Sequence, residues 1–177
     1  MKKVCIAVLA LVAYVGNLNA QENAVKANPL GLVFGTAQFG YERAITEKNS
    51  IEVSLAYASV SATVDSDDTK ATGFGAEGKY KFYFSSSKQG IRGWYAAPTV
   101  GFNSAKASSG SSEGKLSWVA GGAVAGYQWV FGGSDRGFAL DLNLGAQYVS
   151  AKTSGDISGV SIDGILPKLG LSLGYAW

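Results

Sequence analysis

The feature that most constrains this chain is a repeated alternation of large apolar residues with small or polar ones. In the block 137–149, the large residues on one face are Phe138, Leu140, Leu142, Leu144, Ala146 and Tyr148. The other face carries Ala139, Asp141, Asn143, Gly145, Gln147 and Val149. The last ten residues repeat this pattern, and further copies cover 51–60, 72–84, 93–103 and 115–131. A period of two puts alternate side chains on opposite faces of a strand, so these blocks predict six β-strands.

The polar faces of these strands are too poor in charge to form the outer surface of a soluble barrel or sandwich. Charged residues make up only 16% of the chain, below the roughly 25% of ordinary soluble domains. Small and glycine-rich faces suit a narrow interior, and the bulky faces then meet lipid. Because hydrocarbon satisfies no backbone N–H or C=O group, a membrane-spanning sheet has to close on itself. The pattern therefore predicts an all-β, closed, antiparallel, up-and-down transmembrane β-barrel.

The connections predict how many strands the barrel has. Segments 46–49, 85–92 and 132–136 are short or moderate, whereas 65–69, 104–114 and 152–164 are rich in Ser, Gly, Asp and Lys. The last two are the longest, and long loops of such barrels lie outside the cell. With both termini in the periplasm, residues 24–45 must hold two more strands, with a tight turn within Leu30–Thr36. We expect eight strands, or ten if a long loop contains a further hairpin.

Three local features test this arrangement. Pro98 lies in mid-strand, which predicts a bulge or a lost ladder bond. Arg43 has lipid-facing parity, so we place it at the periplasmic rim beside Thr46. Aromatic residues predict two interfacial girdles. One girdle comprises Phe82, Phe84, Trp94, Trp129, Phe131, Phe138, Tyr175 and Trp177, and the other comprises Phe74, Phe102, Trp118 and Tyr148, with Trp118 on inward parity.

The first twenty residues have the features of a secretory signal. Lys2 and Lys3 precede an apolar stretch over 4–15, and Ala20 offers a cleavage point. Cleavage after Ala24 and retention as a membrane anchor are the alternatives, although the stretch is too short to span a bilayer. We expect a signal peptide at 1–20 and one barrel domain at 21–177. Removal of Lys2 and Lys3 leaves 13 basic and 13 acidic residues, which argues against a nucleic-acid-binding face.

Several charged residues have inward parity on the predicted strands. They are Glu42, Glu52, Glu77, Lys79, Lys81, Asp141 and Lys168. An unpaired buried charge is costly, so we expect these side chains to form an ion-pair network in the lumen, with Gln38, Gln128, Asn143 and Gln147 as hydrogen-bond partners. Inward Tyr83, Tyr95 and Gln128 would narrow the lumen further. The same carboxylates leave open a second interpretation, a general acid/base pair of a His-free enzyme.

No residue set indicates a catalytic, cofactor or metal site. The chain has no His, which excludes Ser-His and Cys-His nucleophiles, and its single Cys5 lies in the signal segment. Residues 73–78 match GxGxxG but lie in a predicted strand with no following helix, and 85–88 match SxxK without companion motifs. Asp65, Asp67 and Asp68 lack the Gly and Glu of a calcium loop. We expect no cofactor, no metal and no enzymatic activity.

Four short motifs carry a resemblance to a known family. They are Asn28-Pro29-Leu30-Gly31-Leu32, Gly40-Tyr41-Glu42-Arg43, Ala97-Pro98 and a terminal Leu171-x-Leu173-x-Tyr175-x-Trp177. Together they resemble a family of small Gram-negative outer-membrane proteins of unknown function, with an eight-stranded, OmpA/OmpX-like barrel architecture. The terminal motif is also similar to the C-terminal signal that the outer-membrane assembly machinery recognises. The resemblance implies fold and location and supplies no catalytic residue.

These observations predict a small integral outer-membrane barrel with a structural or surface-interaction role, neither an enzyme nor an open pore. Its expected partners are outer-membrane lipid, lipopolysaccharide and the assembly machinery, with no nucleic acid, and we expect a monomer. The segments 104–114 and 152–164 would form its contact surface. Two alternatives stay open: a secreted soluble β-barrel that binds a small apolar ligand, and a His-free lipid-modifying barrel enzyme.

Overall fold

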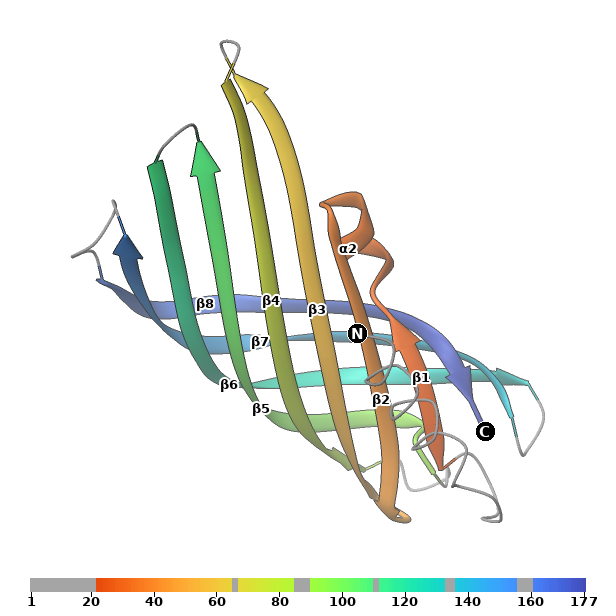
Figure 1. Ribbon diagram of the computed structural model, residues 1–177. Coiled ribbons are helices and arrows are strands. Elements are labelled where there is room, and N and C mark those ends of the chain that lie inside the picture. Colours follow the sequence, from red (N-terminus) through yellow and green to blue (C-terminus); the bar gives the residue numbers. More distant parts are fainter. Residues whose placement is uncertain (1–21, 65–66, 85–89, 110–111, 133–135, 156–160) are drawn as a thin grey trace.

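The chain forms a closed, eight-stranded antiparallel barrel in which every strand pairs with its neighbours in sequence and β1 pairs with β8 (Figure 1). The computed structural model describes residues 22–64, 67–84, 90–109, 112–132, 136–155 and 161–177. The strands are β1 (Asn23–Ala27), β2 (Thr36–Thr46), β3 (Asn49–Val64), β4 (Asp67–Tyr83), β5 (Gly93–Ser109), β6 (Ser112–Gly132), β7 (Gly137–Gly155) and β8 (Ser161–Ala176). The predicted fold class and the strand number of eight are confirmed. None of the helices in the described part of the chain has the length and apolar character of a membrane span.

The predicted outer loops are wrong in extent, because the strands continue into all three. Strand β4 begins at Asp67, so 67–69 of the predicted loop 65–69 are paired with β3. Strand β5 extends to Ser109 and β6 begins at Ser112, so nearly all of 104–114 is a paired hairpin. Likewise β7 extends to Gly155 and β8 begins at Ser161, which leaves only 156–160 of the predicted loop 152–164 outside the described residues. Ser- and Gly-rich composition indicates a loop only where the backbone lacks a partner. Here each strand end finds its partner in the adjacent strand.

The first hairpin is connected by a short helix and not by the predicted tight turn. Strand β1 ends at Ala27 and is followed by α2 (Pro29–Val33). The Asn28 side chain caps this helix by accepting a hydrogen bond from the Gly31 amide at 3.1 Å, and Pro29 occupies the first turn. Both are preferred positions for these residues at a helix start. Gly35 then adopts a φ of 73°, which returns the chain into β2.

The local predictions for Pro98 and Arg43 agree with the structure. In the β4–β5 ladder the pairing is interrupted between Lys79↔Thr99 and Phe82↔Ala96, at the level of Pro98, and the register on either side is unchanged. Proline therefore costs ladder pairing without making a bulge. Arg43 is exposed and lies three residues before the end of β2, beside the β2–β3 turn.

The barrel is apolar on its outside and charged on its inside. Leu142 and Leu144 expose 42% and 61% of their surface, whereas Asp141, between Leu140 and Leu142 on the same strand, exposes 1%. The soluble alternative required this leucine face to be inside, and the structure places it outside.

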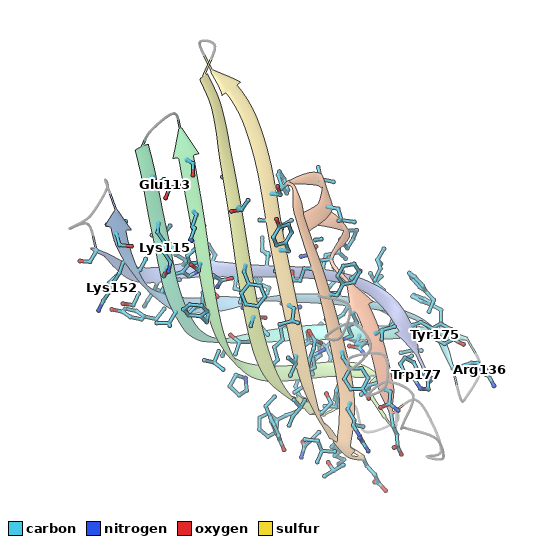
Figure 2. All side chains as sticks on the ribbon, viewed as in Figure 1. Glu113, Lys115, Arg136, Lys152, Tyr175 and Trp177 are labelled. Atoms are coloured by element: carbon cyan, nitrogen blue, oxygen red, sulfur yellow. The ribbon has the colours of Figure 1, made fainter. Side chains whose placement is uncertain are left out.

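Outward aromatic residues lie in two bands. At the end of the barrel near the termini, Trp94 packs edge-to-face on Tyr127, and Phe131 stacks on Phe138. Tyr175 and Trp177 stack at that same end, opposite the end with Glu113, Lys115 and Lys152 (Figure 2). Members of the second band are Tyr57, Phe74, Phe102 and Tyr148, all exposed. The placement of Trp118 in this band is wrong, because its inward parity turns the indole into the lumen, where it lines a cavity.

Candidate functional site in the barrel interior

Strand parity brings all seven predicted lumen residues inside the barrel. Cross-strand register sets Glu42 of β2 opposite Glu52 of β3, and Glu52 opposite Lys79 of β4. Like charges directly opposite each other repel, so the two glutamates need cations from elsewhere in the barrel. Strands β1 and β4 supply them.

Five side chains form what we call the inner cluster: Lys26, Lys81, Glu42, Glu52 and Asp141. The Lys26 ammonium donates to Glu42, to Glu52 Oε2 at 2.8 Å and to Asp141 Oδ2 at 2.9 Å. Lys81 Nζ lies 2.6 Å from Asp141 Oδ2, 2.8 Å from Glu52 Oε2 and 3.1 Å from Glu42 Oε2. All five residues are buried. The two lysines thus bridge three carboxylates from three different strands.

Lys26 is the functional residue that sequence reasoning missed. The predicted network had four acids and three bases, and such an excess of buried negative charge is unfavourable. Lys26 is the fourth base. Together with Lys79, Lys81 and Lys168 it balances the four acids of the lumen. Two signals in the sequence could have identified Lys26. The predicted network had one base fewer than acids, and Lys26 follows the outward Val25, so its side chain points inward.

Aromatic and amide side chains complete the plug at the inner end. Tyr83 donates its hydroxyl to Glu42 Oε1 at 2.7 Å, and Tyr95 donates to Asp141 Oδ1 at 2.6 Å. Gln128 accepts from Lys26 at 2.7 Å and donates to the Ile91 carbonyl at 2.7 Å. Tyr83, Tyr95, Gln128 and Ile91 are each at most 5% exposed. The predicted narrowing by Tyr83, Tyr95 and Gln128 is therefore present.

A second group of charges lies further along the lumen, toward the long hairpins. Lys79 Nζ is 2.9 Å from Glu52 and 3.5 Å from Glu77, and Lys168 pairs with Glu77. Lys168 also donates to Gln147 at 3.3 Å. Beyond the inner cluster, these residues border a cavity of about 380 Å³. The lumen is thus filled at one end and hollow at the other.

The carboxylates of the inner cluster have the spacing of a cation site, since ligand atoms of Glu42, Glu52 and Asp141 lie within 4.8 Å of one another. Two ammonium groups already contact these oxygens. A metal ion would have to displace Lys26 and Lys81 from several hydrogen bonds each. The described residues therefore fit lysine as the resident cation of this cluster.

The terminal motif closes the barrel. Leu171, Leu173 and Tyr175 lie on β8, and the last residue, Trp177, exchanges two backbone hydrogen bonds with Asn23, at 2.9 and 3.0 Å. The end of the chain is thereby tied to its first strand.

The remaining candidate motifs lie in a strand or outside the described residues. Gly73–Gly78, which matches GxGxxG, is part of β4 and no helix follows it in the described chain. Asp67 and Asp68 begin β4, and their side chains lie outside the described set, as do Asp65, residues 85–88 and the expected signal peptide at 1–20.

Comparison with known proteins places this architecture in a family. Among solved structures, the chain is similar to the translocator domain of the autotransporter NalP from Neisseria meningitidis, with 11% identity and a TM-score of 0.42. The similarity covers 98% of this chain and 66% of that one. No curated protein sequence matches significantly. A family model described as "Protein of unknown function (DUF3575)" matches residues 5–156. The match covers most of the chain, which therefore belongs to the DUF3575 family of proteins of unknown function.

Proposed function

We propose that this protein is a small integral outer-membrane β-barrel with a structural or surface-interaction role. The observation that carries the proposal is the inverted arrangement of its side chains. Phe39, Leu144 and Leu169 expose 61–79% of their surface, whereas Lys26, Glu42 and Lys81 expose at most 4%. A water-soluble barrel with this surface would present a continuous apolar belt, which soluble monomers avoid.

The height of the apolar belt fits a bilayer. On β7 it runs from Phe138 to Tyr148, the length of roughly 9–11 residues that a tilted spanning strand needs. Beyond this belt the outward residues become charged, as Lys115 and Lys152 show (Figure 2). The strands β5 to β7 thus continue past the belt into a polar medium. Contacts with lipopolysaccharide and other surface partners would be made by these paired strand extensions and not by the loops first expected.

The inner cluster supports a role without catalysis and without an open pore. Glu42 and Glu52 are both paired with Lys81 and buried, so neither is placed to exchange a proton with a substrate. The same residues, with Tyr83, Tyr95 and Gln128, fill the periplasmic end. The barrel would be exported with residues 1–20 as a signal, inserted by the outer-membrane assembly machinery and present as a monomer.

Fractionation tests the proposal. The full chain is expressed in a Gram-negative host, membranes are extracted with alkaline carbonate, and inner and outer membranes are separated by density. The expected result is retention in the pelleted outer membrane, with heat-modifiable migration in detergent gels. Release of the folded protein into the carbonate supernatant would refute the membrane assignment.

The enzyme alternative has its own test. A His-free lipid-modifying barrel would alter the lipid of the host outer membrane, through Glu42 or Glu52. Mass spectrometry of lipid A and phospholipids is therefore compared between cells with the wild type and cells with the Glu52→Gln variant. Identical lipid profiles are expected. A modification present only with the wild type would contradict the non-catalytic role.

A further inference from the structure

The outer half of the lumen contains a cavity that the structural role does not use. It has a volume of about 380 Å³ and lies between the inner cluster and the hairpin tips. A smaller hollow of about 210 Å³ continues it toward the tips and shares Thr36, Asn103 and Trp118 in its lining. Small residues on the neighbouring strands β4 and β5, such as Gly75 and Gly101, leave this space free.

The lining is rich in hydrogen-bonding groups and has no uncompensated charge. Its carboxamides are Asn28, Gln38, Asn103, Asn143 and Gln147. The charged lining residues are paired, Lys168 with Glu77 and Lys79 with Glu52. Carboxamides both donate and accept hydrogen bonds. Such a surface favours a neutral ligand with many hydroxyl or amide groups over an anion or a cation.

Asn143 is the strongest single indication of a ligand. Its residue is 7% exposed, it lines the cavity, and its Oδ1 accepts no hydrogen bond from any described residue. A buried polar atom without a partner costs free energy. The Asn143 amide packs over Gly170, and a turn of the amide toward a ligand donor in the cavity would remove that cost.

Trp118 adds the apolar element of the site. Every other Trp of the described chain lies at the girdle near the termini, whereas Trp118 breaks the outward pattern and lines the cavity. An indole face packs well against the C–H groups of a sugar ring, while the surrounding amides bond its hydroxyls.

Beside the cavity, part of β8 has no pairing partner in β1. Strand β1 pairs only with Leu173–Ala176 of β8. The residues of β8 that line the cavity, Pro167, Lys168, Leu169, Gly170 and Ser172, precede these pairs. Helix α2 lies alongside, and its residues Leu32 and Val33 and its C-cap Phe34 are exposed (Figure 1). An apolar edge next to a polar cavity suits a lipid whose polar head group enters the cavity while its acyl chain stays on the apolar edge. The ligand of the cavity could therefore be either a free molecule or the head group of a lipid.

We propose that the outer lumen is a binding site for a neutral sugar unit, either as a free saccharide or as the head group of a glycolipid. Asn143 and the other carboxamides would bond its hydroxyls, and Trp118 would pack on its ring. The proposal goes beyond the structural role and does not rest on it, because the cavity is a property of the folded barrel in any amphiphilic environment.

The test uses the full-length protein in dodecylphosphocholine micelles. Glucose, galactose, N-acetylglucosamine and lactose are titrated in one arm, and the sugar-headed lipid octyl glucoside in the other. Binding is measured by calorimetry and by saturation transfer from protein to ligand protons. Saturable binding in the first arm assigns a free saccharide, and binding in the second arm alone assigns a glycolipid. Absence of binding in both arms overturns the proposal, as does tighter binding of inorganic phosphate than of any sugar.

A matched pair of valine variants locates the site. A Cβ at Gly101 meets only ordinary contacts, the nearest being the Ala76 carbonyl at 3.4 Å, so Gly101→Val fills the cavity. Gly121, on the neighbouring strand, faces outward and has no atom within 4 Å of such a Cβ. Affinity should fall at least about tenfold in Gly101→Val, the loss of one good hydrogen bond or more. It should be unchanged in Gly121→Val, and equal affinities in the two variants would place the ligand elsewhere.

The variant Asn143→Leu shows whether a loss of sugar binding can occur without a loss of the fold. Replacing an unpartnered buried amide with an apolar residue leaves stability equal or higher. The variant should therefore keep its heat-modifiable migration and lose sugar binding by about tenfold or more. Undiminished binding in this folded variant would refute the assigned role of Asn143.

Discussion

At the scale of single residues, the interior is organised by charge balance. Four lysines and four carboxylates meet in the lumen, and Lys26 holds the centre of the inner cluster with contacts to three acids and Gln128. Removing one member of a buried network leaves its partners desolvated and uncompensated. Each member therefore stabilises the barrel mainly in the presence of the others.

Lys26→Met should destabilise the barrel strongly. The loss expected for breaking a buried ion pair is about 3–5 kcal/mol in the free energy of unfolding, measured by reversible urea unfolding in micelles. Lys152→Met, at an exposed outward position, is the control and should unfold near the wild-type midpoint. In the double variant Lys26→Met/Glu42→Gln part of the loss should be regained, because one uncompensated anion is removed. Strictly additive losses would contradict the coupling.

Gly126→Ala probes the packing around the same cluster. A Cβ at this position would lie 2.6 Å from Tyr95 Cζ and 2.6 Å from the Leu142 carbonyl oxygen. Tyr95 is held by Asp141 and the carbonyl belongs to the paired β7, so neither yields easily. We expect a loss of about 1–3 kcal/mol, seen as a lower temperature for the heat-modifiable band shift. Gly121→Ala, which has open space around its Cβ, should leave that temperature unchanged. The packing argument fails if the two variants behave alike.

At the scale of elements, the short β1 and the end of β8 form the weakest seam of the barrel. Their ladder has four residue pairs, whereas β6 and β7 pair along nearly their whole lengths. Trp177 adds backbone bonds to Asn23 and a ring stack on Tyr175 at this seam. The proposed assembly signal lies at the same seam. A variant there can change the stability of the barrel, its recognition by the assembly machinery, or both, and an experiment has to separate the two effects.

The proposed function assigns the terminal aromatic residue to recognition by the outer-membrane assembly machinery, and on that proposal Trp177→Ala should lower the amount of assembled barrel several-fold. The same variant refolded in micelles should keep its barrel, since the backbone bonds to Asn23 do not depend on the indole. Phe131→Ala, another girdle aromatic, is the control and should assemble normally. Equal assembly of the Trp177 variant and the wild type in cells would contradict the signal role.

At the scale of the whole molecule, the outward face determines the environment that the barrel tolerates. Leu142 lies near the middle of the belt between Phe138 and Tyr148, whereas Ile45 lies beside the β2–β3 turn. Both are outward and about half exposed, at 42% and 52%. The two positions lie at different depths, and Ile45 also sits where the β2–β3 register shifts, between Ala44 and Thr46.

Leu142→Arg should destabilise the barrel in phospholipid vesicles by about 2–4 kcal/mol, the cost of a cation at mid-bilayer, and Ile45→Arg by about 0–1 kcal/mol. Folding in vesicles is followed by tryptophan fluorescence along a denaturant series. In aqueous buffer without lipid, a soluble barrel would tolerate both substitutions equally. Equal losses in vesicles would therefore argue against a spanning orientation.

Much of this architecture was determined by the sequence alone. Alternation with period two assigned nearly every inward and outward residue, from Glu42 on β2 to Lys168 on β8. It did so because successive side chains of a strand point to opposite faces of the sheet. The apolar character of the outward face followed from the same pattern, together with the low content of charge. The alternation also predicted that Trp118 points inward. Its assignment to an outward girdle ignored this and was wrong.

Only the tertiary structure decided how the inward residues meet and where the strands end. Alternation carries no information on depth, so the convergence of Lys26, Glu52 and Asp141 from strands far apart in sequence depends on register and barrel closure. Nor does composition reveal that the Ser- and Gly-rich segments stay paired, since a strand continues wherever a neighbour offers hydrogen-bonding groups. The filled inner end and the hollow outer end of the lumen arise from these long-range relations between strands.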